Sequence, residues 1–218
     1  MSSDVSRGLR SVVPLISSRP TAKAIFVAGL VLFMVVQVRV AGLDLLRRIF
    51  RRRTGVARLD RGSLLFVTAA AGFGVGGAFL LEANVPSATI GAGVAPIRWL
   101  CFAAGVTAIV LGSLGRQSAI STLGRFFTLN VTISDEQRVV TSWPYRWVRH
   151  PSYTADLLAF TGIGLALGNW LALLAAAVLP LLGLLVQIHV EEKALFTNLG
   201  EPYQAYAAGK KRLVPRVW

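Results

Sequence analysis

The side chains that can do chemistry are concentrated in two stretches of a chain that is otherwise mostly apolar. Residues 115–153 hold arginine, aspartate, glutamate, glutamine, tryptophan, tyrosine and histidine side chains, and a connection of this length in a small protein is expected to be functional. The second stretch is the adjacent carboxylate pair Glu191 and Glu192. Such a pair can bind cationic or hydroxyl-bearing groups, or it can be the solvated start of a polar tail, and the residue types alone leave both interpretations open.

Metal chemistry is not predicted. Cys101 is the single cysteine, which excludes an internal disulfide and a cysteine-based zinc site. The two histidines, His150 and His189, are too few for a histidine-rich metal site.

The elements that must position these residues are apolar helices. The chain has 218 residues, of which 54% are hydrophobic and only 15% charged, and its mean hydropathy is +0.61. A membrane helix needs about 20 apolar residues. The apolar runs cover residues 24–46, 63–81, 97–114, 154–167 and 170–188. We therefore predict an all-α integral membrane bundle of about five helices, with a short fourth helix that forms a hairpin with the fifth across Gly168 and Asn169.

The charge distribution predicts the orientation in the membrane. The formal net charge is +13, and seven arginines fall within residues 47–61. Clustered basic residues beside a span mark the cytoplasmic side and attract anionic headgroups, which we prefer to a nucleic-acid site. The stretch 115–152 and the tail after residue 188 are also basic, so they are expected on the cytoplasmic side. The side of the basic N-terminus stays open.

Three segments follow from this pattern. Residues 1–61 hold the first membrane helix and the arginine-rich loop, 62–114 the second and third helices, and 115–218 the polar loop, the hairpin and the tail, which together are the predicted catalytic region. The first run begins too late and is too long for a signal peptide. Small residues four apart, Gly72 with Gly76 and Gly164 with Gly168, are expected to allow close helix packing.

An ordered series of motifs occupies residues 110–218. It comprises Leu-Gly-Arg at 123–125, Val-Val-Thr at 139–141, Pro-Tyr-Arg at 144–146, Arg-His-Pro-Ser-Tyr at 149–153, Glu-Glu-x-x-Leu at 191–195, Gly-x-x-Tyr-x-x-Tyr at 200–206 and Arg-x-x-Pro at 212–215. This series resembles the isoprenylcysteine carboxyl methyltransferase family, whose members are integral membrane enzymes that use S-adenosylmethionine.

The resemblance implies a site. It places the cofactor in a cytoplasmic pocket formed by the loop before the fourth helix, the start of that helix and the tail. The implied cofactor-binding residues are Gln137, Val139, Tyr145, Arg149, His150, Pro151, Tyr153, Glu191, Glu192, Tyr203 and Tyr206. The implied catalytic residues are Arg116 and Arg125, on the substrate side, and Arg149.

The types of the implied residues match the chemical groups of S-adenosylmethionine and of a carboxylate acceptor. Arginine can clamp a carboxylate in bidentate fashion, glutamate accepts from ammonium or ribose hydroxyls, and aromatic rings attract a sulfonium. A carboxylate acceptor is already a nucleophile at neutral pH, so its methylation needs alignment and no general base.

The predicted activity is therefore carboxyl methylation of an isoprenylcysteine-like, lipophilic substrate at the cytoplasmic face of a bacterial or archaeal plasma membrane. Three alternatives stay open: lipid N-methylation, which requires a base; an NADPH-dependent sterol or steroid reductase of related fold, which Asp156 favours; and a non-catalytic membrane protein. Gln187 stands where the family often has a basic residue. Asp156 must be paired or line a wet cavity. The sequence does not indicate an oligomeric state.

Overall fold

The computed structural model describes residues 15–51, 57–58, 62–129, 132–133 and 137–218, and the side chains of 47–51, 57–58 and 132–133 are outside that description. The elements, in chain order, are α2 (Leu15–Ser18), α3 (Pro20–Arg51), β1 (Ala57–Arg58), α4 (Ser63–Asn84), the 3₁₀ turn η1 (Pro86–Ala88), α5 (Ala95–Leu123), the 3₁₀ turn η2 (Gly124–Phe126), β2 (Thr132–Ile133), α6 (Pro151–Leu167), α7 (Trp170–Leu199) and α8 (Glu201–Ala208). The two short strands pair antiparallel, with Ala57 opposite Ile133. The arginines of 47–61, predicted to bind anionic headgroups, lie outside the described side chains.

The predicted helical membrane bundle is confirmed. Within the described residues, four helical stretches are long and apolar enough to cross a membrane: Pro20–Leu46, Ser63–Asn84, Ala95–Phe126 and Trp170–Leu199. The predicted count of five crossings is not confirmed, because the 17 residues of α6 rise only about 25 Å against a hydrocarbon core of about 30 Å. Large apolar side chains such as Leu65 and Phe73 are about three-quarters exposed, as lipid-facing residues are in a protein viewed without its membrane.

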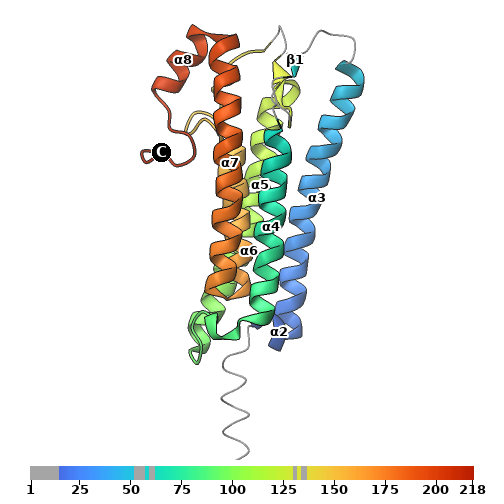
Figure 1. Ribbon diagram of the computed structural model, residues 1–218, viewed down its shortest axis with the longest axis vertical. Helices are drawn as coiled ribbons and strands as arrows, with labels where there is room; N and C mark the ends of the chain where they lie inside the picture. Colours follow the sequence, from blue (N-terminus) through green and yellow to red (C-terminus); the bar gives the residue numbers. More distant parts are fainter. Residues whose placement is uncertain (1–14, 52–56, 59–61, 130–131, 134–136) are drawn as a thin grey trace, which may run out of the picture.

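The long helices lie side by side, with α8 and β1 at one end of the bundle (Figure 1). The other end is closed where the α6–α7 turn meets the connection before α5. There the Ile90 amide donates to the Gly168 carbonyl at 2.8 Å, and the Asn169 side chain donates to the Val85 carbonyl at 2.8 Å. The side-chain carbonyl oxygen of Asn169 also accepts hydrogen bonds from the first backbone amides of α7 and thereby caps that helix. The predicted hairpin is therefore confirmed.

Glycines bring the helices into backbone contact, though not all of those predicted. A Cβ at Gly112 in α5 would lie 2.5 Å from the Ala155 carbonyl oxygen in α6, and a Cβ at Gly164 would lie 2.6 Å from the Leu173 Cα. Among the described residues, no atom lies within 4 Å of a Cβ placed at Gly72, Gly76 or Gly168. The prediction is therefore wrong for the first pair and holds for only one member, Gly164, of the second. The glycine of α4 that does pack closely is Gly74, against Pro180 of α7.

Two helices extend into the predicted polar stretches. The α5 helix continues to Leu123, so the first nine residues of the predicted polar connection, 115–123, are helical. The α7 helix continues to Leu199 and is followed by Gly200, whose positive φ of 56° favours glycine. The carboxylate pair therefore lies within α7, nearly two turns before its end.

Candidate cofactor pocket

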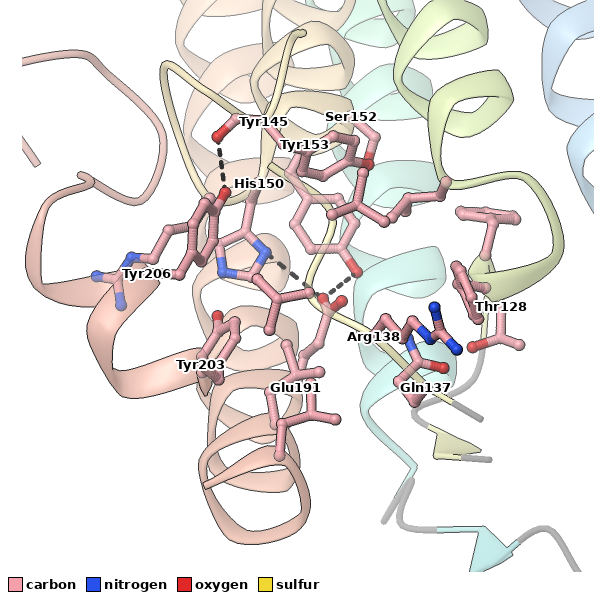
Figure 2. Close-up of a pocket in the computed structure, with 18 of the residues that line it drawn as sticks. Thr128, Gln137, Arg138, Tyr145, His150, Ser152, Tyr153, Glu191, Tyr203 and Tyr206 are labelled. Carbon is pink, nitrogen blue, oxygen red and sulfur yellow. Dashed lines mark hydrogen bonds and ion pairs between the residues drawn. The ribbon is translucent and has the colours of Figure 1, made fainter. Parts of the chain in front are cut away.

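A pocket opens at the α8 end of the bundle, where the connection after α5 faces α6, α7 and α8 (Figure 2). It encloses roughly 870 Å³ of space, part of it open to solvent. Both polar and apolar side chains line it. The lining consists of Leu123, Phe126, Phe127, Thr128, Leu129, Gln137, Arg138, Val139, Val140, Tyr145, Arg149, His150, Ser152, Tyr153, Gln187, Glu191, Leu195, Leu199, Tyr203 and Tyr206.

Glu192 is the centre of a buried ionic cluster beside the pocket. One of its oxygens, Oε1, lies 2.9 Å from Arg149 Nη1 and 3.2 Å from His150 Nε2, and Oε2 accepts from Arg212 Nε at 2.9 Å. Glu192 is only 4% exposed, and a buried carboxylate is costly unless it is paired and hydrogen-bonded. These three donors satisfy it. Glu192 therefore organises the pocket wall without itself lining the pocket.

The C-terminal tail reaches this cluster because its backbone pairs with the segment before α6. The Arg149 amide donates to the Lys211 carbonyl at 2.8 Å, and the His150 amide donates to the Arg212 carbonyl at 3.0 Å. Thr154, in the first turn of α6, donates to the Leu213 carbonyl at 2.8 Å. This pairing places Arg149 and Arg212 on either side of Glu192.

Glu191 faces the pocket, in contrast to its neighbour. Successive residues of a helix point about 100° apart, so adjacent glutamates need not share an environment. Glu191 Oε2 accepts from the Tyr153 hydroxyl at 2.9 Å and lies 3.6 Å from His150 Nδ1, and its side chain is 32% exposed (Figure 2). The His150 ring also stacks on the Tyr153 ring, with centroids 5.5 Å apart. The Nε2 atom of His150 thus has a hydrogen-bonded carboxylate partner, and its Nδ1 atom lies near a second carboxylate.

Three tyrosines build the adjoining wall. The Tyr206 hydroxyl donates to the Tyr145 carbonyl at 2.7 Å (Figure 2). The Tyr145 hydroxyl donates to the Ala119 carbonyl at 3.3 Å. Tyr203 is buried and packs edge-on against Phe196, with centroids 5.0 Å apart. Burial raises the pKa of Tyr145 and Tyr203 above the usual value, and that of Tyr206 to about 12. All three therefore keep their protons at neutral pH, and the Tyr145 and Tyr206 hydroxyls donate hydrogen bonds to backbone carbonyls.

The predicted cofactor-binding residues converge on this pocket, with two exceptions. Gln137, Val139, Tyr145, Arg149, His150, Tyr153, Glu191, Tyr203 and Tyr206 line it. Pro151 and Glu192 do not: Pro151 is the buried first residue of α6, and Glu192 faces the tail.

The three predicted catalytic arginines lie in three different environments. Arg149 lines the pocket. Arg116 is buried in α5, away from the lining, and forms an ion pair with Asp156 of α6, which also accepts from Gln37 Nε2 at 3.2 Å. The expectation that Asp156 must be paired is therefore confirmed. Arg125 is exposed, with its guanidinium 5.0 Å from the centre of the Phe126 ring.

Several lining residues were not predicted from the sequence. Arg138 and Thr128 lie on the wall that faces Glu191 across the pocket (Figure 2). Leu123, Phe126, Phe127, Leu195 and Leu199 form the apolar part. Arg138 is adjacent to Gln137, so neighbourhood in sequence was a signal for it. The apolar residues carried no signal, because leucine and phenylalanine occur throughout the chain.

The pocket fits S-adenosylmethionine by the chemistry of its donors and acceptors. Arg149 Nε and Gln187 Oε1, both on lining residues, are buried atoms with no hydrogen-bond partner among the described residues. Buried polar atoms in native proteins are normally paired, which points to a ligand with both donors and acceptors. Glu191, the tyrosines and the aliphatic wall complement an ammonium, hydroxyls and a purine ring.

Comparison with known proteins supports the same interpretation. The model of the isoprenylcysteine carboxyl methyltransferase family matches residues 104–197. Protein-S-isoprenylcysteine O-methyltransferase B of Arabidopsis thaliana is 35% identical over 122 residues, which are 55% of this chain and 62% of the relative. A methanethiol S-methyltransferase from a Pseudomonas strain is 35% identical over 85 residues, 38% of this chain and 31% of the relative. The chain thus spans less than two thirds of the length of these curated relatives.

A solved structure is similar in fold. The eukaryotic intramembrane Ras methyltransferase ICMT superposes with a TM-score of 0.61 at 23% identity, over 93% of this chain and 70% of that one. The resemblance predicted from the sequence is therefore confirmed, and over residues 104–197 this chain matches the isoprenylcysteine carboxyl methyltransferase family.

Proposed function

We propose that this protein transfers a methyl group from S-adenosylmethionine to the carboxylate of an isoprenylcysteine-like, lipophilic acceptor. The observation that carries the proposal is the pocket, which joins a carboxylate, two arginines and neutral tyrosine hydroxyls to an aliphatic wall. The relatives named above are methyltransferases by name, which supports the reaction class.

The cofactor would supply an electrophilic methyl group on its sulfonium. Arg149, held by Glu192, would bind the cofactor carboxylate, and Glu191 would accept from its ammonium or ribose hydroxyls. The rings of Tyr203 and Tyr206 would shield the sulfonium from water and attract its charge. In this scheme the enzyme accelerates the reaction by aligning the acceptor carboxylate with the methyl group. No general base is needed, because the acceptor is already ionised when it binds.

Arg138 is the better candidate for the acceptor carboxylate than Arg116. It lines the pocket on the wall opposite Glu191, whereas Arg116 is buried between α5 and α6 beside Asp156 and does not line the pocket (Figure 2). We therefore assign acceptor binding to Arg138 and a structural role to Arg116. Arg125 is exposed and does not line the pocket.

Two alternative functions are less well supported by the geometry. N-methylation requires a base close to the acceptor. His150 Nε2 lies at Glu192 and Asp156 is paired with Arg116, while Glu191, the remaining candidate, is assigned to the cofactor in this proposal. The reductase hypothesis relied on Asp156, which pairs with Arg116 and does not line the pocket. The basic connections at this end of the bundle favour a pocket on the cytoplasmic side of a plasma membrane.

Calorimetry on the detergent-purified protein tests the cofactor. We expect S-adenosylhomocysteine to bind and NADPH not to bind, and Arg149→Ala to abolish binding. The matched control is Arg146→Ala, because Arg146 is exposed, does not line the pocket and lies over the Trp147 ring. Binding of NADPH without S-adenosylhomocysteine would refute the proposal.

A product assay tests the acceptor. With radiolabelled S-adenosylmethionine and an S-farnesylcysteine acid, we expect a methyl group that mild base releases as methanol. We expect Arg138→Gln to raise KM for the acid with little change in cofactor affinity. A base-stable product would indicate N-methylation or S-methylation instead.

A further inference from the structure

The tryptophans of this chain gather at the two ends of the helix bundle. Trp99 and Trp170 stand near the starts of α5 and α7, at the end where the α6–α7 turn closes the bundle. Trp143, Trp147 and Trp218 stand at the pocket end, in the segment before α6 and in the tail. All five of the chain's tryptophans are between 39% and 56% exposed, which is unusual for the largest aromatic side chain.

The spacing of the two groups corresponds to a bilayer. The Thr122 hydroxyl, in the last turn of α5, donates to the Trp143 carbonyl at 3.1 Å and fixes the level of Trp143 along that helix. From Trp99 to Thr122 the helix rises about 35 Å at 1.5 Å per residue. That separation lies between the hydrocarbon thickness of about 30 Å and the full thickness of about 40–45 Å. Both groups therefore fall at interface depth, where tryptophan is enriched.

The pocket-end group is part of a surface that is both aromatic and basic. We call it the interfacial patch and define it as Trp143, Arg146, Trp147, Lys211, Arg216 and Val217, all of which are exposed. Its two segments are held together by the bridge between Val148 and Lys211. The tail lies alongside the upper part of the bundle, below α8, and not beyond its end (Figure 1).

The charge of this surface has a single sign. Residues 137–150 and 202–218 contain no aspartate or glutamate. The guanidinium of Arg146 lies 5.0 Å from the centre of the Trp147 ring, an arrangement that keeps the charge next to the apolar ring. A protein partner would normally bring hydrogen-bonding groups of mixed character, whereas an anionic bilayer surface offers negative headgroups directly above acyl chains.

We propose that the interfacial patch binds the anionic lipid surface of the leaflet at the pocket end. The tryptophan rings and Val217 insert at the boundary between headgroups and acyl chains, and Arg146, Lys211 and Arg216 contact lipid phosphates. Because Arg149 and Arg212 continue the same two segments into the Glu192 cluster, this attachment sets the depth of the pocket at the headgroup level. An acceptor held in the membrane by its lipid then meets the pocket without leaving the bilayer.

Spin labels test the depth directly. Cys101 is the only cysteine, so Cys101→Ser provides a cysteine-free background. Nitroxides are attached through Ser142→Cys and Val217→Cys, which keep the tryptophans, and through Gln204→Cys, an exposed position on α8, as the control. In nanodiscs of phosphatidylcholine with about 30% phosphatidylglycerol, we expect the ratio of oxygen to nickel-chelate accessibility to be several-fold higher at 142 and 217 than at 204.

Equal ratios at all three positions would overturn the proposal. So would protection of 142 and 217 from both probes that arises only when a prenylated polypeptide is added, since that result would identify a protein partner. Circular dichroism checks that each variant keeps the helix content of the parent, so that a failed ratio is not attributed to unfolding.

Lipid preference tests the charge. Brominated phosphatidylglycerol should quench the tryptophan fluorescence of the parent more than brominated phosphatidylcholine. Arg146→Gln with Lys211→Gln should reduce that preference, on the order of fivefold per charge removed. The pair Arg19→Gln with Lys23→Gln is the matched control, because Arg19 immediately precedes α3, Lys23 lies in its first turn, and both are exposed. An unchanged preference in the Arg146 and Lys211 variant would refute the headgroup contact.

Discussion

Replacing Glu192 by glutamine should separate the ionic cluster from the pocket that it supports. Glutamine keeps the size of the side chain but removes its charge. Its NH₂ group replaces one of the two carboxylate oxygens, so it must face either Arg149 and His150 or Arg212. Each of these partners is a donor in the native contacts, at 2.9, 3.2 and 2.9 Å. One side of the cluster must therefore lose its hydrogen bonds.

The expected loss can be worked from burial. Removing one partner of a buried ion pair typically costs about 3–5 kcal/mol, because the other charge is left buried and unpaired. The side chain of Arg149 is 12% exposed, so this estimate applies to it, whereas that of Arg212 is 39% exposed and its contribution is discounted to at most about 1 kcal/mol. Since glutamine can keep one hydrogen bond, we expect Glu192→Gln to lower the free energy of unfolding by about 2–4 kcal/mol.

The assay is reversible unfolding in mixed detergent micelles, with S-adenosylhomocysteine affinity measured on the same samples. Glu201→Gln is the matched control, because Glu201 is an exposed acid at the start of α8. We expect the control to unfold like the parent, and Glu192→Gln to bind S-adenosylhomocysteine more weakly because Arg149 loses its orientation. If the two variants are equally stable and bind equally well, Glu192 does not organise the wall and the reasoning fails.

Three further predictions concern the bundle and the tyrosine wall. Asp156→Ala should destabilise the protein by about 3–5 kcal/mol in the same unfolding assay, because it leaves Arg116 buried without a counter-charge. The double variant Arg116→Met with Asp156→Leu replaces the ion pair by apolar side chains and should recover most of that loss. A double variant as unstable as the single one would contradict this. Gly112→Ala should cost about 1–3 kcal/mol by overpacking, measured as a lower melting temperature, whereas Gly72→Ala should be neutral. The pKa of Tyr206, about 12, is raised above that of an unfolded tyrosine, so its stabilisation is full below about pH 10 and is lost as the pH rises toward 12. Tyr206→Phe should therefore lose less stability than the parent between those two pH values in an alkaline unfolding titration.

The composition predicted the helical bundle, and the motif order predicted a set of residues that meet in space. Nine of the eleven predicted cofactor-binding residues line one hollow although they come from three separate segments. This succeeds because each motif lies at the end of an apolar helix, and helices of similar length that begin on opposite sides of a membrane bring those ends together. The hairpin at Asn169 was predictable for a local reason, since its side chain caps the following helix.

Other features depend on packing that no local pattern encodes. The partner of Arg116 is Asp156, 40 residues away, and Gln37 is 119 residues from that same carboxylate. These two contacts form only if α3, α5 and α6 are each rotated about their axes so that the three side chains face one another. Gly74 packs closely and Gly72 does not, although both belong to the same apolar run, because only one of them faces α7. Small residues predict that a close contact is possible, while the rotation of the helix decides which one is used.

The adjacent glutamates connect this structural logic to the proposed chemistry. Two like charges side by side would repel if both faced one pocket, and such a pair raises the cost of ionisation for each member. The structure separates them: Glu192 is bound by two arginines and a histidine of the chain itself, while Glu191 has the Tyr153 hydroxyl and an open side toward the pocket. Only one carboxylate is then left to meet a ligand, and Arg149, oriented by the other, offers the opposite charge on the same wall. A site so divided presents one negative and one positive group at a defined spacing, which is what recognition of an amino acid zwitterion on S-adenosylmethionine requires. Exchanging the two roles, by Glu191→Gln compared with Glu192→Gln, should therefore separate their effects: the first should weaken S-adenosylhomocysteine binding with little loss of stability, and the second should reduce both.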